Sequence, residues 1–167
     1  MEALIAHTER IAAMLRARNE TVAVAESAAG GLITAALLAV PGASAYCRGG
    51  VVVYTREAWE ALRDFNVALL GGHRSATEQN ALVRARLAKQ RFSADWGLGE
   101  TGAAGPSGNR YGDPAGHAWV AVSGPGERTL RISTGRNERL ANMHAFALAT
   151  LELFEHCLSV QPPWENT

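Results

Sequence analysis

Lysine is nearly absent from this sequence. Of the 16 basic residues, 15 are arginine, and Lys89 is the only lysine. The difference matters because a lysine amine can lose its proton and act as a base, whereas an arginine guanidinium stays charged in a protein. Lys89 lies in an arginine-rich segment that we expect to form a solvated helix face. Chemistry that needs a catalytic lysine therefore has no obvious candidate.

An excess of charge of either sign is also missing. The 16 basic and 16 acidic residues give a formal net charge of +0. Such a balance creates no overall field to attract nucleic acid or an anionic membrane surface, so we expect neither as a partner. With 47% hydrophobic and 19% charged residues, the composition is that of an ordinary globular protein.

Long apolar runs and cysteine motifs are absent as well. No stretch is apolar for long enough to span a bilayer, and the charged first 20 residues lack the pattern of a secretory signal. Cys47 and Cys157 lie far apart without metal-ligand spacing, which argues against a disulfide framework or a zinc site. We therefore expect a cytoplasmic protein with no metal and no cofactor.

The length of 167 residues fits one domain, which we place at 1–160, followed by a tail at 161–167. The spacing of apolar residues and the positions of glycine and proline predict alternating elements within it. Helices are expected at 2–18, 28–40, 56–65, 77–92 and 140–158, and strands at 21–25, 46–54, 94–100, 117–124 and 128–134.

This order is typical of an α/β domain with a mixed sheet, in which the last two strands form an antiparallel hairpin. Residues 101–116 contain five glycines and two prolines and are expected to form a loop. Ligand sites in such sheets lie where loops leave the carboxyl ends of strands. Two loops have this position, "ESAAGG" at 26–31 and "ETGAAGPSGNRYGDPAG" at 100–116.

Both loops begin with a glutamate and a hydroxyl residue and continue in alanine and glycine. Backbone can approach a ligand closely there, and peptide N–H groups at a helix start can face an anion. The alternative is that the glycines only form turns. Neither loop has the Walker lysine or the full dinucleotide glycine spacing, so neither is a standard phosphate motif.

Four stretches, "TVAVAESAAGG", "VPGASAYCRGGVVVYTREAW", "ETGAAGPSG" and "DPAGHAWVAV", resemble in order the blocks of the CinA C-terminal domain, the nicotinamide-nucleotide amidohydrolase family. In that family the first block usually reads E-S-C-T-G-G, the second ends near Y-S-N-x-x-K and the third reads T-G-x-A-G-P. The resemblance extends over roughly residues 4–157. It implies a three-layer α/β/α sandwich with a mixed, mostly parallel sheet, and self-association into a homo-oligomer.

The resemblance also implies an activity, hydrolysis of the carboxamide of nicotinamide mononucleotide. The family nucleophile maps to Ser27, and Tyr54 belongs to the second catalytic block. A serine hydroxyl needs a neighbouring base, and a lysine of lowered pKa can serve as that base. Thr101 and backbone amides would then hold the oxyanion or the substrate phosphate. The expected substrate-binding residues are Gly30, Gly31, Arg56, Thr101, Gly102 and Gly105.

The sequence departs from the family pattern beside the expected site. The position of the family lysine, counted from Tyr54, is Trp59, and that of the family asparagine is Arg56. Ala28 and Ala29 replace a cysteine and a threonine. A further family arginine near the last helix corresponds to either Arg136 or Arg139.

Each candidate has a simpler interpretation. Ser27 can be a helix N-cap without chemistry, Tyr54 and Trp59 can belong to the core, and Arg56 can be an exposed residue at a helix start. Glu26 is expected to orient its loop. Two histidines, His73 and His117, flank the loops and are alternative bases.

Three functions remain open at this point. The first is a CinA-like domain that binds a pyridine nucleotide with weak or no amidohydrolase activity. The second is an active amidohydrolase that uses Ser27 with a different base. The third is a non-catalytic interaction module.

Overall fold

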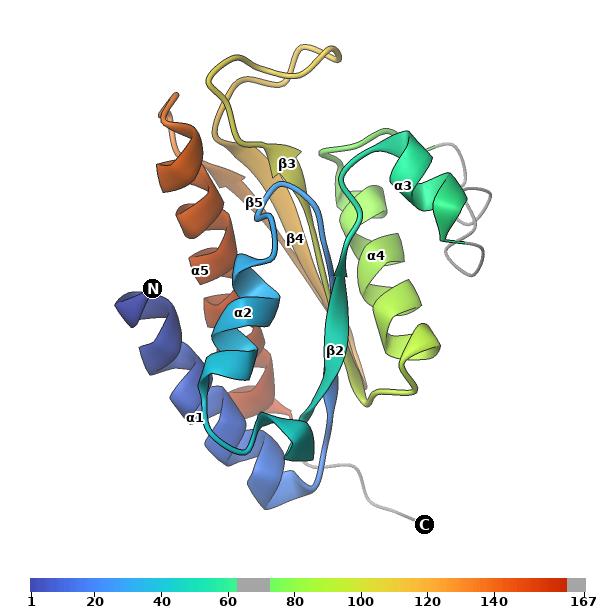
Figure 1. Ribbon diagram of the computed structural model, residues 1–167, viewed down its shortest axis with the longest axis vertical. Helices are drawn as coiled ribbons and strands as arrows, with labels where there is room; N and C mark the ends of the chain where they lie inside the picture. The colour runs from blue at the N-terminus through green and yellow to red at the C-terminus, as the bar shows by residue number, and fades with distance from the viewer. Residues whose placement is uncertain (63–72, 162–167) are drawn as a thin grey trace.

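A computed structural model of the protein describes residues 1–62 and 73–161. Helices and strands alternate along the chain as expected (Figure 1). The elements are α1 (Glu2–Arg18), β1 (Val22–Glu26), α2 (Leu32–Ala39), a 3₁₀ turn (Ala43–Ala45), β2 (Cys47–Val52), α3 (Arg56–Ala61), α4 (Glu78–Arg91), β3 (Trp96–Ala103), β4 (His117–Ser123), β5 (Glu127–Ser133) and α5 (Arg139–Val160).

Five strands form one mixed sheet in the order β2-β1-β3-β4-β5. β1 pairs in parallel with both β2 and β3, so that Val24 lies opposite Gly50 on one side and Leu98 on the other. β4 is antiparallel to both of its neighbours, and it is the one strand of this sheet that runs against the rest. The carboxyl ends of β1, β2 and β3 therefore lie along the same edge, at the top of Figure 1.

Helices cover both faces of the sheet. One face carries α1, α2 and α5, and the other carries α4 with α3 beside it (Figure 1). Alternation along β1 divides its side chains between the layers, because Val22 and Val24 enter the core under α2 and α5 while Ala23 and Ala25 face the α3 and α4 side. The structure is thus the expected three-layer α/β/α sandwich.

Helix α4 lies unusually close to β3. A methyl group added at Gly97 or Gly99 would collide with the carbonyl oxygens of Ala85 and Ala81, so only glycine permits this approach. The small side chains on the inner face of α4 contribute to the same contact. This close packing brings the first half of α4 against the carboxyl ends of the central strands.

The structure differs from the sequence expectations mainly at element ends. β3 continues to Ala103, so Thr101 and Gly102 lie in a strand paired with β4 and not in a loop. Helix α2 begins at Leu32, after a turn, and not at residue 28. Residues 63–65 of the expected helix and 162–167 of the expected tail lie outside the described residues.

Within residues 1–62 and 73–161, no helix is both long and apolar enough to cross a lipid bilayer.

Candidate functional site

Glu26 organises the turn after β1. Its buried carboxylate accepts hydrogen bonds from the backbone N–H groups of Gly31 at 2.9 Å, Ile33 at 3.2 Å and Thr34 at 3.0 Å, and from the Thr34 hydroxyl at 2.6 Å. A carboxylate is favourable at this place because the first amides of a helix have no partner within the helix. The expectation that Glu26 orients its loop is therefore confirmed.

Glu100 holds the same turn from β3. One of its oxygens, Oε2, accepts hydrogen bonds from the N–H groups of Ser27 and Ala29, both at 2.9 Å. The other, Oε1, is sealed from solvent and has no hydrogen-bond partner among the described residues. Burial raises the pKa of Glu100 to about 7, against the opposing effects of the two amides and of Arg84. The two loops singled out in the sequence are thus joined by a carboxylate.

The amides of the 27–31 turn are largely used by the protein itself. Gly31 donates to Glu26, and Gly30 donates to the carbonyl oxygen of Ser27 at 3.1 Å. A ligand would therefore have to contact Gly30 and Gly31 through other atoms. The sequence analysis did not predict this use of the amides, although the glutamate near the end of each of the two strands was an available signal.

Ser27 does not cap a helix. The N-cap residue of α2 is Gly31, and the side chain that accepts from the first amides of the helix is that of Glu26. Ser27 is 7% exposed, and its hydroxyl makes no hydrogen bond with any residue in the described ranges. The hydroxyl group is thus available for chemistry, but no base contacts it.

Thr101 lies next to Glu100 on β3 and is almost fully buried. Its hydroxyl accepts a hydrogen bond from the backbone N–H of Ala76 at 3.0 Å. Ala25 pairs with Gly99 across the parallel strands, so the chain places Ser27 and Thr101 at the same edge of the sheet. Gly102 packs against Ala118 of β4, where a Cβ would collide.

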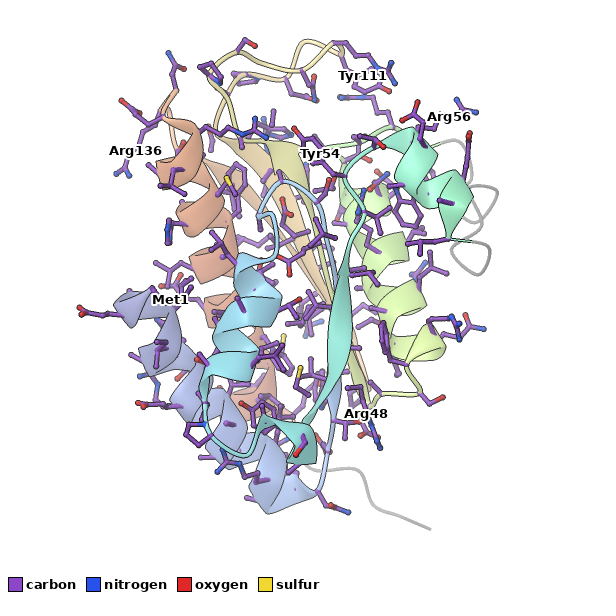
Figure 2. The ribbon with its side chains drawn as sticks, in the orientation of Figure 1. Met1, Arg48, Tyr54, Arg56, Tyr111 and Arg136 are labelled. Atoms are coloured by element: carbon purple, nitrogen blue, oxygen red, sulfur yellow. The ribbon has the colours of Figure 1, made fainter. Side chains whose placement is uncertain are left out.

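Tyr54 and Arg139 contact each other at this edge of the sheet. Arg139 Nη2 donates to the Tyr54 hydroxyl at 2.8 Å, and Arg139 Nη1 donates to the carbonyl oxygen of Gly105 at 2.7 Å. Tyr54 is 56% exposed and is not a core residue. Arg136 lies on the outer side of the molecule, away from Tyr54 (Figure 2). Of the two arginines left open by the sequence, Arg139 is the one at the candidate site.

Trp59 is buried, with an exposed fraction of 5%. Its ring centroid lies 4.6 Å from the guanidinium carbon of Arg84, a cation–π arrangement. Arg84 Nε donates to Asn80 Oδ1 at 2.8 Å, and Nη1 donates to the carbonyl oxygens of Val53 at 3.0 Å and Glu26 at 3.5 Å. Burial lowers the pKa of Arg84 to about 10, so the group stays charged near neutral pH.

Arg84 was missed in the sequence because the helix that carries it contains several arginines. A signal was present, since Ala81, Ala85 and Ala88 form the inner face of α4 and Arg84 recurs on that face. A polar residue on an apolar helix face calls for a buried partner.

The other charged candidates lie elsewhere. The side chain of Arg56 is 72% exposed and pairs with Glu60 at 3.0 Å along α3 (Figure 2). His73 is exposed. His117 is buried, and its Nε2 donates to the carbonyl oxygen of Ala76 at 3.0 Å. It lines a groove of about 330 Å³ together with Arg74, Asp113 and Arg131 among others.

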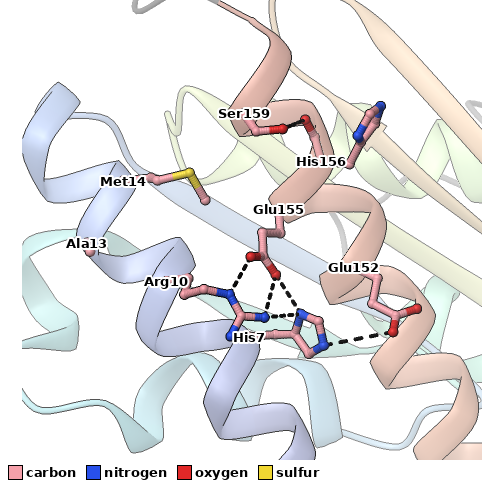
Figure 3. Close-up of a pocket in the computed structure, with 8 residues that line it drawn as sticks. All are labelled: His7, Arg10, Ala13, Met14, Glu152, Glu155, His156 and Ser159. Carbon is pink, nitrogen blue, oxygen red and sulfur yellow. Dashed lines mark hydrogen bonds and ion pairs between the residues drawn. The ribbon is translucent and has the colours of Figure 1, made fainter.

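A second groove, of about 560 Å³, lies between α1 and α5 (Figure 3). Glu155 accepts from His7 and Arg10 there, each at 2.5 Å, and these contacts join the two helices. The groove lies away from the strand ends. Among the described residues, no group of three or more His, Cys, Asp or Glu side chains could hold a metal ion.

Comparison with known proteins agrees with the motifs. The family model for the CinA C-terminal domain matches residues 5–158. A CinA-like protein of Anaeromyxobacter sp. (strain Fw109-5) is 41% identical over 143 residues, which cover 84% of this chain and 35% of the relative. A CinA-like protein of Prochlorococcus marinus (strain MIT 9313) is 42% identical over 112 residues, 67% of this chain and 26% of the relative. The chain thus spans about a third or less of these relatives.

Solved structures show the same fold. The competence damage-inducible protein A (ComA) from Klebsiella pneumoniae subsp. pneumoniae MGH 78578 superposes with a TM-score of 0.87 at 25% identity, covering 95% of this chain and 99% of that one. The competence/damage inducible protein CihA from Agrobacterium tumefaciens gives 0.83 at 28% identity, with 94% and 96% covered. The model match, the relatives and the fold agree, and the chain belongs to the CinA C-terminal domain family.

Proposed function

We propose that this chain binds a pyridine nucleotide such as nicotinamide mononucleotide and hydrolyses its carboxamide weakly or not at all. Membership of the family supports the ligand class, since the family motifs resemble those of nicotinamide-nucleotide amidohydrolases. The ligand would lie at the carboxyl ends of β1, β2 and β3, the edge of the sheet to which Ser27, Tyr54 and Thr101 belong.

The observation that carries the proposal is the packing of Trp59 on Arg84. The resemblance places the catalytic lysine at position 59, and here an indole ring stacks on a charged guanidinium instead. An arginine of pKa about 10 is a poor base near neutral pH. General-base assistance contributes roughly 10²- to 10⁴-fold to such reactions, so its loss would be large.

Arg139 is the residue best placed to bind the ligand phosphate. It is exposed at the first residue of α5, and its guanidinium is already oriented by Tyr54 and Gly105. A planar guanidinium with several N–H donors binds phosphate oxygens well. Arg56 is a weaker candidate because it is paired with Glu60 on the outer side of α3.

The proposal is tested by measuring binding and turnover separately. Nicotinamide mononucleotide should raise the melting temperature of the protein, since a ligand of the native state stabilises it by mass action. Arg139→Ala should weaken this shift, whereas Arg136→Ala, the matched control, should not. Ammonia release should be at or near the level of Ser27→Ala. Ordinary turnover would contradict the weak-activity claim, and no melting shift at millimolar ligand would favour a non-catalytic interaction module.

A second candidate, an active amidohydrolase with another base, is favoured by one feature. Glu100 has a pKa of about 7 and its carboxylate contacts the main chain of Ser27. Ammonia release that is abolished by both Ser27→Ala and Glu100→Gln would support this candidate over the first.

A further inference from the structure

Arg84 is a buried cation whose charge is balanced only in part, by the more distant carboxyl group of Glu100. It is 2% exposed, and within the described ranges no carboxylate lies at ion-pair distance from it. Buried charges in proteins are ordinarily paired, because an unpaired one loses its hydration without compensation. The carbonyl oxygens of Val53 and Glu26 compensate part of this loss but carry no net charge.

One nitrogen of the guanidinium donates to no residue that the structure describes. Nε and Nη1 donate to Asn80, Val53 and Glu26, whereas Nη2 makes no hydrogen bond with any described residue. Nη2 is also not among the fully buried described atoms that lack a partner. Nη2 therefore keeps a small accessible area, within the 2% exposure of the whole residue, while Nε and Nη1 hold the group in place.

The position of Arg84 connects it to the candidate site. The two carbonyl groups that it contacts belong to the residues directly before Ser27 and Tyr54. Trp59, which the resemblance aligns with the family lysine, covers one face of the guanidinium. A positive charge is thus retained near the place of the lost amine, but on α4 instead of α3.

We propose that Arg84 binds an oxyanion of the ligand, a carboxylate or a phosphate, through Nη2. The inference rests on the proposed function for the ligand class and deepens it, because a site with a fixed cation favours an acidic pyridine nucleotide over the neutral carboxamide. The contacts of Nε and Nη1 orient the guanidinium before the ligand arrives, so little side-chain freedom is lost on binding. A carboxylate would bring a full negative charge to Nη2, whereas a carboxamide oxygen carries no net charge.

The test compares the dissociation constants of nicotinic acid mononucleotide, nicotinamide mononucleotide and nicotinic acid riboside by titration calorimetry. If Arg84 binds a carboxylate, the wild-type protein should bind nicotinic acid mononucleotide about 10- to 100-fold more tightly than nicotinamide mononucleotide. Arg84→Met should remove this preference. Arg86→Met, on the exposed side of the same helix and paired with Glu127, is the matched control and should keep it.

The other outcomes separate the alternatives. If the anion is the phosphate, Arg84→Met weakens both mononucleotides equally and leaves the riboside unchanged. If no pyridine nucleotide binds but nicotinate or inorganic phosphate stabilises the wild type and not Arg84→Met, the proposed function fails and the anion site stands. Binding of both mononucleotides that is equal in wild type and unchanged in Arg84→Met overturns the anion site alone.

Two further measurements keep the test decisive if Arg84→Met does not fold. The first measurement needs only the wild-type protein. If it prefers neither the acid over the amide nor the mononucleotide over the riboside, the inference is contradicted. Arg84→Lys keeps a positive charge and should retain part of the preference. A protein that none of these compounds or ions stabilises overturns the inference and the proposed function together.

Discussion

Glu100 is a buried carboxyl group whose two oxygens have different surroundings. Oε2 accepts two amide hydrogen bonds, and Oε1 has no partner within residues 1–62 and 73–161. The folded protein keeps the proton up to about pH 7, whereas the ordinary value is 4.5. Between these values the folded state binds more protons than the unfolded chain, so the stability contributed by this group falls as pH rises.

Glu100→Gln should therefore gain stability relative to the wild type as pH rises from 5 to 8, by about 3 kcal/mol. Urea unfolding at both pH values measures this difference. Glu127→Gln is the control. The hydrogen bond from Arg86 lowers the pKa of Glu127, and its contribution is lost only below the ordinary range. If the difference in unfolding free energy between the wild type and Glu100→Gln is the same at both pH values, the raised pKa of Glu100 is contradicted.

Trp59 and Arg84 form a buried cation–π pair. Trp59→Lys would place an ammonium group beside a buried guanidinium and remove an aromatic ring, and it should cost about 3–5 kcal/mol. Adding Arg84→Met removes the repulsion, so the double variant should be more stable than the single one in urea unfolding. If the proposed function holds, ammonia release should rise above wild type in the double variant only. A double variant no more stable than Trp59→Lys would show that the two side chains are not coupled.

At the scale of elements, the short helix α2 depends on Glu26. The eight-residue helix has no side-chain N-cap, and this carboxylate satisfies its first amides from the end of β1. Glu26→Gln replaces one acceptor oxygen by a donor among these amides and should cost about 3 kcal/mol. Glu60→Gln on the exposed side of α3 is the matched control and should cost at most about 0.5 kcal/mol. Equal losses in urea unfolding would mean that Glu26 does not hold the helix.

The elements also explain which parts of the site the sequence could predict. The strand-then-glutamate pattern at 22–26 and 96–100 was visible, and both glutamates lie at the expected sheet edge. The end of β3 could not be predicted from the sequence. Gly102 pairs with Ala118 of β4, and this long-range pairing overrides the local preference of glycine for a turn.

At the scale of the whole molecule, two free thiols show whether the core opens locally or unfolds as one unit. Cys47 on β2 and Cys157 on α5 are both buried, and burial raises the pKa of each thiol. A thiol reagent such as Ellman's reagent should modify neither one in the native protein, and both should react together across the urea unfolding transition. Reaction of Cys47 without denaturant would show local opening of the edge strand β2. Self-association and a cytoplasmic location stay predictions.

The sequence by itself determined the order of helices and strands, the α/β class and the family. These properties depend on local patterns, such as the helical spacing in 2–18 and the short runs of β-branched residues, and on four motifs that occur in a fixed order. It also located the two loops at the carboxyl ends of β1 and β3. Each of these inferences needs only neighbours along the chain.

The tertiary structure alone decided what these residues contact. Glu100 reaches the amides of Ser27 and Ala29 more than 70 residues away, and Arg139 bridges Tyr54 and Gly105. Arg84 reaches the carbonyl oxygens of Glu26 and Val53 because glycines in β3 let α4 approach the sheet closely. The contacts of a buried charge, its pKa and its distance from other buried charges follow from how the layers pack, and no local sequence pattern carries that information.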